Sequence, residues 1–256
     1  MKKTYGVLCI ILLIASATVF AISKNPFVGD PKEEYYMVTF ASGIEYWRDC
    51  FAGMKGAAKL LGVKAIYTGA PQADVNQEVT VLEQVIAKKP AGIAITCANP
   101  DGLKAPINKA IAAGIPVVTF DADSPSSDRY SYLGTSNFNA GATAARYMGK
   151  LLGGKGEVAV STVTGQLNHE ERKAGFIQTL AKEYPKIKVV ATGNDNNDQT
   201  KAATLVAGFL QAHPNLKGIF CTDSLGGVGA GVALREAKAV GKVKIISFDT
   251  DKGTLD

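Results

Sequence analysis

The chain has 256 residues, 46% hydrophobic and 20% charged, which is enough for one large or two modest globular domains with real cores. The formal net charge is only +5 and no run of Lys or Arg forms a stripe, so we expect no nucleic-acid partner. The four cysteines include no C-x-x-C pair, so we predict neither a disulfide framework nor a metal site.

The N-terminus has the pattern of an export signal. Lys2 and Lys3 precede an apolar run at 7–15, and small residues follow as far as Ala21. This pattern predicts a signal peptide over 1–21, followed by a polar tether at 22–34. The protein is then exported, to the periplasm or to the outer face of the cytoplasmic membrane. The alternative is an uncleaved membrane anchor, although the run at 7–22 is shorter than the ~20 residues that a spanning helix prefers.

From residue 35 onward, short β-branched runs alternate with longer amphipathic ones. We predict strands at 36–40, 63–67, 92–96 and 116–120, with helices at 46–61, 76–87 and 103–113 between them. An irregular stretch at 123–129 and a strand at 130–134 follow. The alternation then resumes with helices at 137–152, 170–184, 200–212 and 228–239 and strands at 158–161, 188–192, 218–221 and 244–248.

This alternation is typical of right-handed βαβ units and parallel sheets. The predicted fold class is α/β, with two doubly wound parallel-sheet lobes. The N-terminal lobe spans 35–122, a crossing spans 123–136, and the C-terminal lobe spans 137–256.

Ligands of open parallel sheets bind beyond the carboxyl ends of the strands, so polar and aromatic residues at those ends are the candidates. They are Tyr46, Trp47, Asn99, Asp121, Asp123, Arg172, Asn197, Asp223 and Asp249. Each also has a structural explanation: Asp121 and Asn99 could stabilise turns, Trp47 could pack in a core, and Arg172 could lie at the surface.

The candidate set contains acids, amides, aromatics and one arginine, but these do not form a conventional catalytic set. No G-x-G-x-x-G follows the first strand and no Walker A motif is present, so we predict a binding protein with no cofactor and no catalytic activity. Tight helix packing explains Gly226, Gly227 and Gly229 better than a phosphate loop does. His169 is better explained as a helix-start residue or as a support for the site than as a ligand contact.

The chemistry of these residues suits a neutral polyhydroxy ligand. A sugar hydroxyl donates one hydrogen bond and accepts two, which matches carboxylates, amides and a guanidinium acting together. Aromatic rings suit the apolar faces of a pyranose, whereas an anionic ligand would need more cations.

Several segments, in the same order, resemble the ribose-binding-protein family. They are Glu45-Tyr46-Trp47 with Gly53, the run at 114–121, Tyr132-Leu133-Gly134-Thr135, the segment at 171–176, and Ile246-Ser247-Phe248-Asp249. The resemblance covers roughly 35–256. It implies a periplasmic binding protein of the type with three crossings, whose lobes close over one monosaccharide and deliver it to the membrane permease of an ABC importer.

The resemblance also implies roles for individual residues. Tyr46 and Trp47 would sandwich the sugar ring with Phe248. The polar contacts of the family fall on Asn99, Asp121, Arg172, Asp223 and Asp249. Three positions depart from the family pattern, at Ile44, Asp123 and Asn197, which predicts a ligand other than ribose. The family continues beyond the position of Asp249 with a further helix and strand, so we expect the C-terminus to be truncated.

The predicted function is therefore an extracytoplasmic, monomeric solute-binding protein that captures a monosaccharide or polyol for an ABC-type importer. One alternative is a membrane-anchored sugar-sensing receptor for a chemoreceptor or sensor kinase. A cytoplasmic sugar-responsive repressor would need a helix-turn-helix before residue 35, where the export pattern lies instead. A Rossmann-type enzyme would need the phosphate fingerprint.

Overall fold

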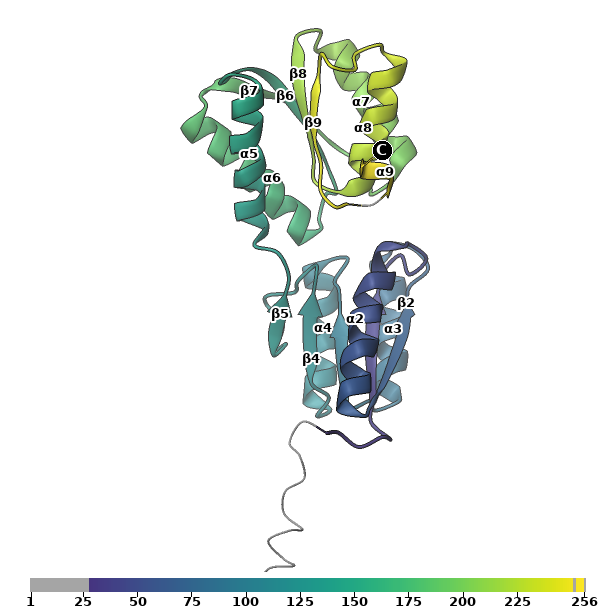
Figure 1. The fold of residues 1–256 in the computed structure, drawn as a ribbon. Helices are drawn as coiled ribbons and strands as arrows, with labels where there is room; N and C mark the ends of the chain where they lie inside the picture. Colours follow the sequence, from purple (N-terminus) through teal and green to yellow (C-terminus); the bar gives the residue numbers. More distant parts are fainter. Residues whose placement is uncertain (1–27, 251, 256) are drawn as a thin grey trace, which may run out of the picture.

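A computed structural model describes residues 28–250 and 252–255. The predicted signal at 1–21 and the first part of the predicted tether lie outside the described residues. Figure 1 shows two lobes, the first coloured purple to teal and the second teal to yellow. Among the described residues, none of the helices has the length and apolar character needed to span a bilayer.

The first lobe is built on a five-stranded parallel sheet of order β2-β1-β3-β4-β5. Its strands are β1 (Glu34–Thr39), β2 (Lys64–Gly69), β3 (Gly92–Ile95), β4 (Val117–Phe120) and β5 (Ser131–Leu133). Its helices are α2 (Tyr46–Leu61), α3 (Val75–Ala87) and α4 (Pro100–Ala112). Apolar residues of α3 and α4 form one core with β1, β3 and β4, and Trp47 of α2 packs in a separate cluster with Met37 and Phe40.

The second lobe has a four-stranded parallel sheet of order β7-β6-β8-β9. Its strands are β6 (Lys155–Thr162), β7 (Lys186–Asn194), β8 (Leu216–Cys221) and β9 (Lys244–Ile246). Its helices are α5 (Asn137–Leu151), α6 (Leu167–Glu183), α7 (Gln199–Ala212), α8 (Ser224–Glu236) and α9 (Lys252–Leu255). Helices α5 and α6 share one core cluster with the sheet, and α7 and α8 share another.

The predicted fold class, two α/β lobes with parallel sheets, is confirmed by this architecture. The segment at 123–136, predicted as the crossing, contains β5, which pairs with β4 and extends the first sheet to Leu133. The chain then enters the second lobe over 134–136, immediately before α5 (Figure 1). This short passage matters because residues on both sides of it belong to the candidate site.

Helices α5 and α6 approach each other closely through two glycines. A β-carbon at Gly141 would lie 1.9 Å from the carbonyl oxygen of Arg172, and one at Gly175 would lie 2.0 Å from the carbonyl oxygen of Phe138. Real β-carbons do not approach backbone this closely, so the close packing of α5 against α6 requires glycine at both positions. The prediction of tight helix packing at Gly229 is confirmed, since a β-carbon there would lie 2.4 Å from the carbonyl oxygen of Gln199.

Candidate functional site

A cleft of about 970 Å³ lies between the carboxyl ends of the two sheets. Seven predicted site residues line it. Tyr46, Trp47 and Asp121 come from the first lobe, and Arg172, Asn197, Asp223 and Asp249 come from the second. The rule that ligands bind beyond the carboxyl ends of parallel strands therefore brings together residues as far apart in the chain as Tyr46 and Asp249.

Aromatic residues at the start of α2 form one wall of the cleft. Trp47 is only 1% exposed, and its indole nitrogen donates to the carbonyl oxygen of Phe40 at 3.0 Å. The rings of Tyr46 and Trp47 meet edge to face at 4.8 Å, an arrangement that aromatic pairs favour. Trp47 is thus held rigidly, and Tyr46 is the more accessible ring.

Asp121 is the central acid of the first lobe. It follows β4 with a backbone φ of 59°, in the left-handed region. Its carboxylate accepts from the Tyr46 hydroxyl at 2.9 Å and from the Thr96 hydroxyl at 3.3 Å. Burial raises the pKa of Asp121, against the opposing effects of Tyr46 and of the positive charge of Arg172 across the cleft.

Arg172 is the principal cation of the cleft and is buried, not exposed at the surface. Its Nε donates to Oδ1 of Asn137 at 2.9 Å, and its Nη1 donates to the carbonyl oxygen of Thr222 at 2.8 Å. The guanidinium carbon lies 4.0 Å from the centre of the Phe248 ring, a cation–π contact. These contacts fix the orientation of the guanidinium before any ligand binds.

Two carboxyl groups, those of Asp195 and Asp223, lie side by side in the second lobe. Asp223 caps the N-terminus of α8, and its Oδ2 is buried without a hydrogen-bond partner among the described residues. Asp195 is completely buried next to it and accepts from the hydroxyl of Ser161. Burial and the neighbouring Asp195 raise the pKa of Asp223 to about 7. The pair therefore tends to share a proton.

This pair makes the stability of the ligand-free protein depend on pH. The pKa of Asp223 is raised from 3.8 to about 7, so the folded chain holds a proton that the unfolded chain releases. That stabilisation is lost as the pH rises through 7, and we expect the free energy of unfolding to fall between pH 6.5 and 8. The Asp223→Asn variant should show a shallower fall in urea unfolding measured at pH 6.5, 7, 7.5 and 8.

Two other titratable groups, His169 and Glu78, determine why the measurement is made between pH 6.5 and 8. Burial lowers the pKa of His169 from 6.5 to about 3, so His169 acts in the opposite direction, and only below pH 6.5. Burial raises the pKa of Glu78 to about 8, so part of the fall should remain in the Asp223→Asn variant. An unchanged slope in that variant would contradict the assignment of the proton to the pair.

His169 also lines the cleft, in the first turn of α6, in agreement with the prediction of a helix-start residue. Its Nδ1 lies 2.9 Å from the hydroxyl of Thr222, and its depressed pKa keeps it neutral. A neutral, hydrogen-bonded imidazole can orient neighbours but carries no exchangeable charge near neutral pH. Among the described residues, no group of His, Cys, Asp and Glu is arranged to hold a metal ion.

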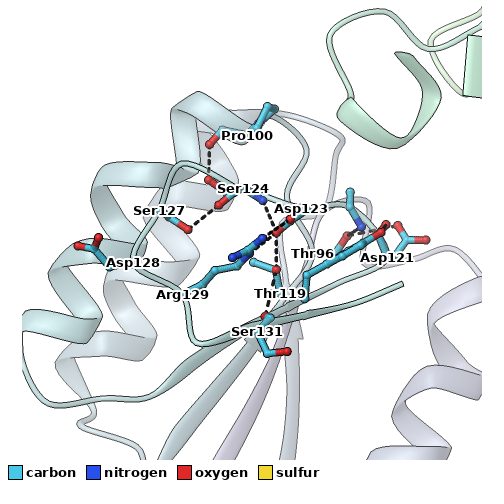
Figure 2. Close-up of polar contacts among 12 residues, drawn as sticks. Thr96, Pro100, Thr119, Asp121, Asp123, Ser124, Ser127, Asp128, Arg129 and Ser131 are labelled. Carbon is cyan, nitrogen blue, oxygen red and sulfur yellow. Dashed lines mark hydrogen bonds and ion pairs between the residues drawn. The ribbon is translucent and has the colours of Figure 1, made fainter. Parts of the chain in front are cut away.

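The structure does not place Asp123 in the cleft. Figure 2 shows its carboxylate turned toward Arg129 and Thr119, in a network separate from the side chain of Asp121. Both oxygens of Asp123 accept from the Arg129 guanidinium at 2.5 Å, and Oδ1 also accepts from the Thr119 hydroxyl at 2.6 Å. Burial acts to raise the pKa of Asp123, but Arg129 and Thr119 hold it below its usual value. Asp123 therefore stabilises the loop before β5.

Asn99 and Phe248 also lie outside the main cleft lining. Asn99 caps α4, and its Nδ2 donates to the carbonyl oxygen of Gly165 in the other lobe at 3.5 Å. It lines an adjoining cavity of about 650 Å³. Phe248 follows β9, which ends at Ile246, and its ring faces Arg172. The sandwich of a sugar ring by Tyr46 and Trp47 with Phe248 stays a prediction.

Some cleft residues were not predicted as ligand contacts. They are Ile44, Gln166, Asn168, Ser224 and Leu225, among others. Gln166 and Asn168 flank the first residue of α6, just beyond the loop that follows β6, so their position near a strand end was the available signal. Their amides add donors and acceptors beside Arg172.

Comparisons with known proteins agree with this geometry. Residues 35–256 match the sequence model of the family described as periplasmic binding protein domain. The arabinose-binding protein of Geobacillus stearothermophilus is 50% identical, with a TM-score of 0.77, over 88% of this chain and 78% of that chain. An ABC transporter solute-binding protein from Burkholderia graminis, solved with D-arabinose, is 39% identical, with a TM-score of 0.84, over 89% of this chain and 80% of that chain. The D-allose-binding periplasmic protein of Escherichia coli is 27% identical over 226 residues, 84% of this chain and 72% of that protein.

Proposed function

This chain belongs to the periplasmic binding protein family, and we propose that its cleft captures a neutral monosaccharide or polyol for an ABC-type importer. One observation carries the proposal. A single pre-oriented arginine faces several acids and an aromatic wall across a cleft between two lobes. The names of the relatives, which bind arabinose and allose, support the same class of ligand.

The polar groups of the cleft match the needs of sugar hydroxyls. Arg172 can only donate, ionised Asp121 can only accept, and Asn197 can do both. A hydroxyl that bridges two such groups uses its donor and its acceptor capacity together. Hydrogen bonds to charged groups contribute about 1.5–3 kcal/mol each, so a few of them are sufficient for tight capture.

We infer that the protein binds its ligand without transforming it. Burial lowers the pKa of His169 to about 3, so it is neutral and only weakly basic near neutral pH, and its Nδ1 lies 2.9 Å from the hydroxyl of Thr222. Two of the cleft acids have structural contacts, since Asp121 accepts from the Tyr46 hydroxyl and Asp223 caps α8 through its Oδ1.

The remaining parts of the proposal concern location and partners. We propose that the protein is exported to the periplasm or to the outer face of the cytoplasmic membrane, in agreement with its family. There it acts as a monomer and presents its sugar-loaded form to a membrane permease. Closure of two lobes around a ligand is the established way in which such folds signal occupancy.

Thermal unfolding of the purified chain in the presence of a sugar panel tests the proposed function. Arabinose, allose, ribose, xylose and several polyols are compared with amino acids and inorganic anions. At 100 times its dissociation constant, a ligand stabilises the folded state by about 2.7 kcal/mol, so one sugar should stand out. The response should disappear in Asp121→Ala while the ligand-free protein remains folded. A response confined to amino acids or anions would refute the assignment.

A further inference from the structure

An unbroken path of hydrogen bonds runs through the passage between the lobes. The hydroxyl of Tyr132, in β5, donates to the carbonyl oxygen of Asp121 at 2.8 Å. Nδ2 of Asn137, the first residue of α5, donates to the Tyr132 hydroxyl at 3.4 Å. Oδ1 of Asn137 accepts from Nε of Arg172 at 2.9 Å. Three bonds thus join the central acid of one lobe to the arginine of the other.

The direction of each bond along this path is fixed. Arg172 can only donate, so Oδ1 of Asn137 must face it and the amide nitrogen must face Tyr132. The hydroxyl of Tyr132 accepts this bond and gives its own proton to the Asp121 carbonyl. Asn137 is only 3% exposed, so water cannot readily replace its partners.

Residues of β5 also hold the strained backbone of Asp121. Its N–H donates to the carbonyl oxygen of Leu133 at 3.0 Å, while its own carbonyl accepts from Tyr132. The left-handed φ of 59° is unfavourable for a residue with a side chain, so surrounding contacts must maintain it. The same strand therefore sets the direction in which the Asp121 carboxylate points.

The turn at 134–136 is packed against this path. A β-carbon at Gly134 would lie 2.1 Å from the Tyr132 hydroxyl, so a larger residue there would displace the end of the Tyr132 side chain. Any change in the angle between the lobes must bend the chain near this turn. Such bending alters the bond between Tyr132 and Asn137, which at 3.4 Å is the longest of the three.

We propose that Tyr132 and Asn137 are positioning residues that couple the guanidinium of Arg172 to Asp121 across the turn at 134–136. The two sides of the cleft then adopt their binding geometry together. This inference rests on the proposed function, because it assigns how the cleft of a two-lobed receptor is organised. Neither residue lines the cleft, so neither touches the sugar. Their effect on binding passes through Arg172 and Asp121.

The test begins with the ligand-free protein. In Tyr132→Phe, the ring remains and only the hydroxyl is lost. We expect the ¹⁵N–¹H resonance of Arg172 Nε to shift in arginine-labelled protein. The removed hydroxyl bonds to Asn137 and not to Arg172 itself, so a shift would be transmitted through Asn137. Tyr130→Phe is the matched control, since Tyr130 is 69% exposed and lies only two residues away. An unshifted Arg172 resonance in Tyr132→Phe would overturn the proposal, whatever the protein binds.

The second measurement is calorimetric affinity for D-arabinose, or for D-allose where it gives the larger thermal shift. Loss of the Tyr132 hydroxyl removes two of the three hydrogen bonds in the path, and it should weaken binding about tenfold or more in Tyr132→Phe. Binding should be unchanged in Tyr130→Phe. Asn137→Ala should weaken binding more, and adding Tyr132→Phe to it should cause little further loss. Fully additive losses would contradict a shared path. If no sugar binds, the proposed function fails, and the resonance of Arg172 still decides the coupling.

Discussion

Replacement of Arg172 by methionine is expected to weaken sugar binding at least about 100-fold. A guanidinium fixed by Asn137 and Thr222 can offer its remaining N–H groups to sugar hydroxyls without further ordering. Two charge-assisted hydrogen bonds contribute about 3–6 kcal/mol, and each 1.4 kcal/mol corresponds to a factor of ten in affinity. Isothermal titration with the sugar that gives the largest thermal shift measures the loss.

Two further variants separate this effect from unfolding. Methionine loses the cation–π contact with Phe248 and leaves the Thr222 carbonyl without its donor, so the ligand-free protein should be less stable yet folded. Arg172→Lys keeps the charge and loses the planar fork, and should bind with intermediate affinity. Arg146→Met is the matched control, because Arg146 lies on α5 and pairs with Glu183 at the surface. Unchanged binding in Arg172→Met would remove Arg172 from the site.

Substitution of Gly141 by alanine is expected to destabilise the protein by about 3 kcal/mol or more. The added β-carbon would lie 1.9 Å from the carbonyl oxygen of Arg172, and backbone atoms on both helices would have to move apart. Overpacking of a well-packed core costs about 1–3 kcal/mol and occasionally more, and here the obstacle is backbone. Because the displaced residue is Arg172, sugar affinity should fall together with the midpoint of urea unfolding.

Gly208→Ala provides the control for this substitution. Gly208 lies inside α7, and a β-carbon there would meet nothing within 4 Å. Alanine is a better helix former than glycine by about 0.8–1.0 kcal/mol, so this variant should be slightly more stable than the parent and bind equally well. If both variants behaved alike, the close contact between α5 and α6 would not be the cause.

Much of the fold and part of the site followed from local patterns in the sequence. The predicted helix at 46–61 coincides with α2, because its amphipathic pattern ends at Gly62, which adopts the left-handed conformation that closes a helix. The alternation of strands and helices predicted parallel sheets, and parallel sheets place strand ends at one edge. That step alone brought Asp121, Arg172 and Asp223 to a common cleft.

The remaining details depend on contacts that the sequence does not reveal. Asp123 follows a buried strand as Asp121 does, but the next loop returns Arg129 to it and occupies its carboxylate. Phe248 was predicted within a strand, whereas β9 ends at Ile246 and leaves the ring facing Arg172. The path of the loop that brings Arg129 to Asp123 and the end of β9 at Ile246 leave no periodic pattern in the sequence, so neither could be predicted from it.

The backbone conformation of three polar cleft residues limits which substitutions could change the ligand that this receptor binds. Asp121, Asn197 and Asp249 all have positive φ, at 59°, 52° and 67°. Asn, Asp and Gly adopt this conformation most readily, whereas β-branched and bulky residues do so at a real cost. Random variation at these positions would therefore yield few folded receptors of new preference. A directed-evolution library is better focused on Ile44, Gln166 and their neighbours in the cleft wall, where the backbone places no such restriction and new recognition is most accessible.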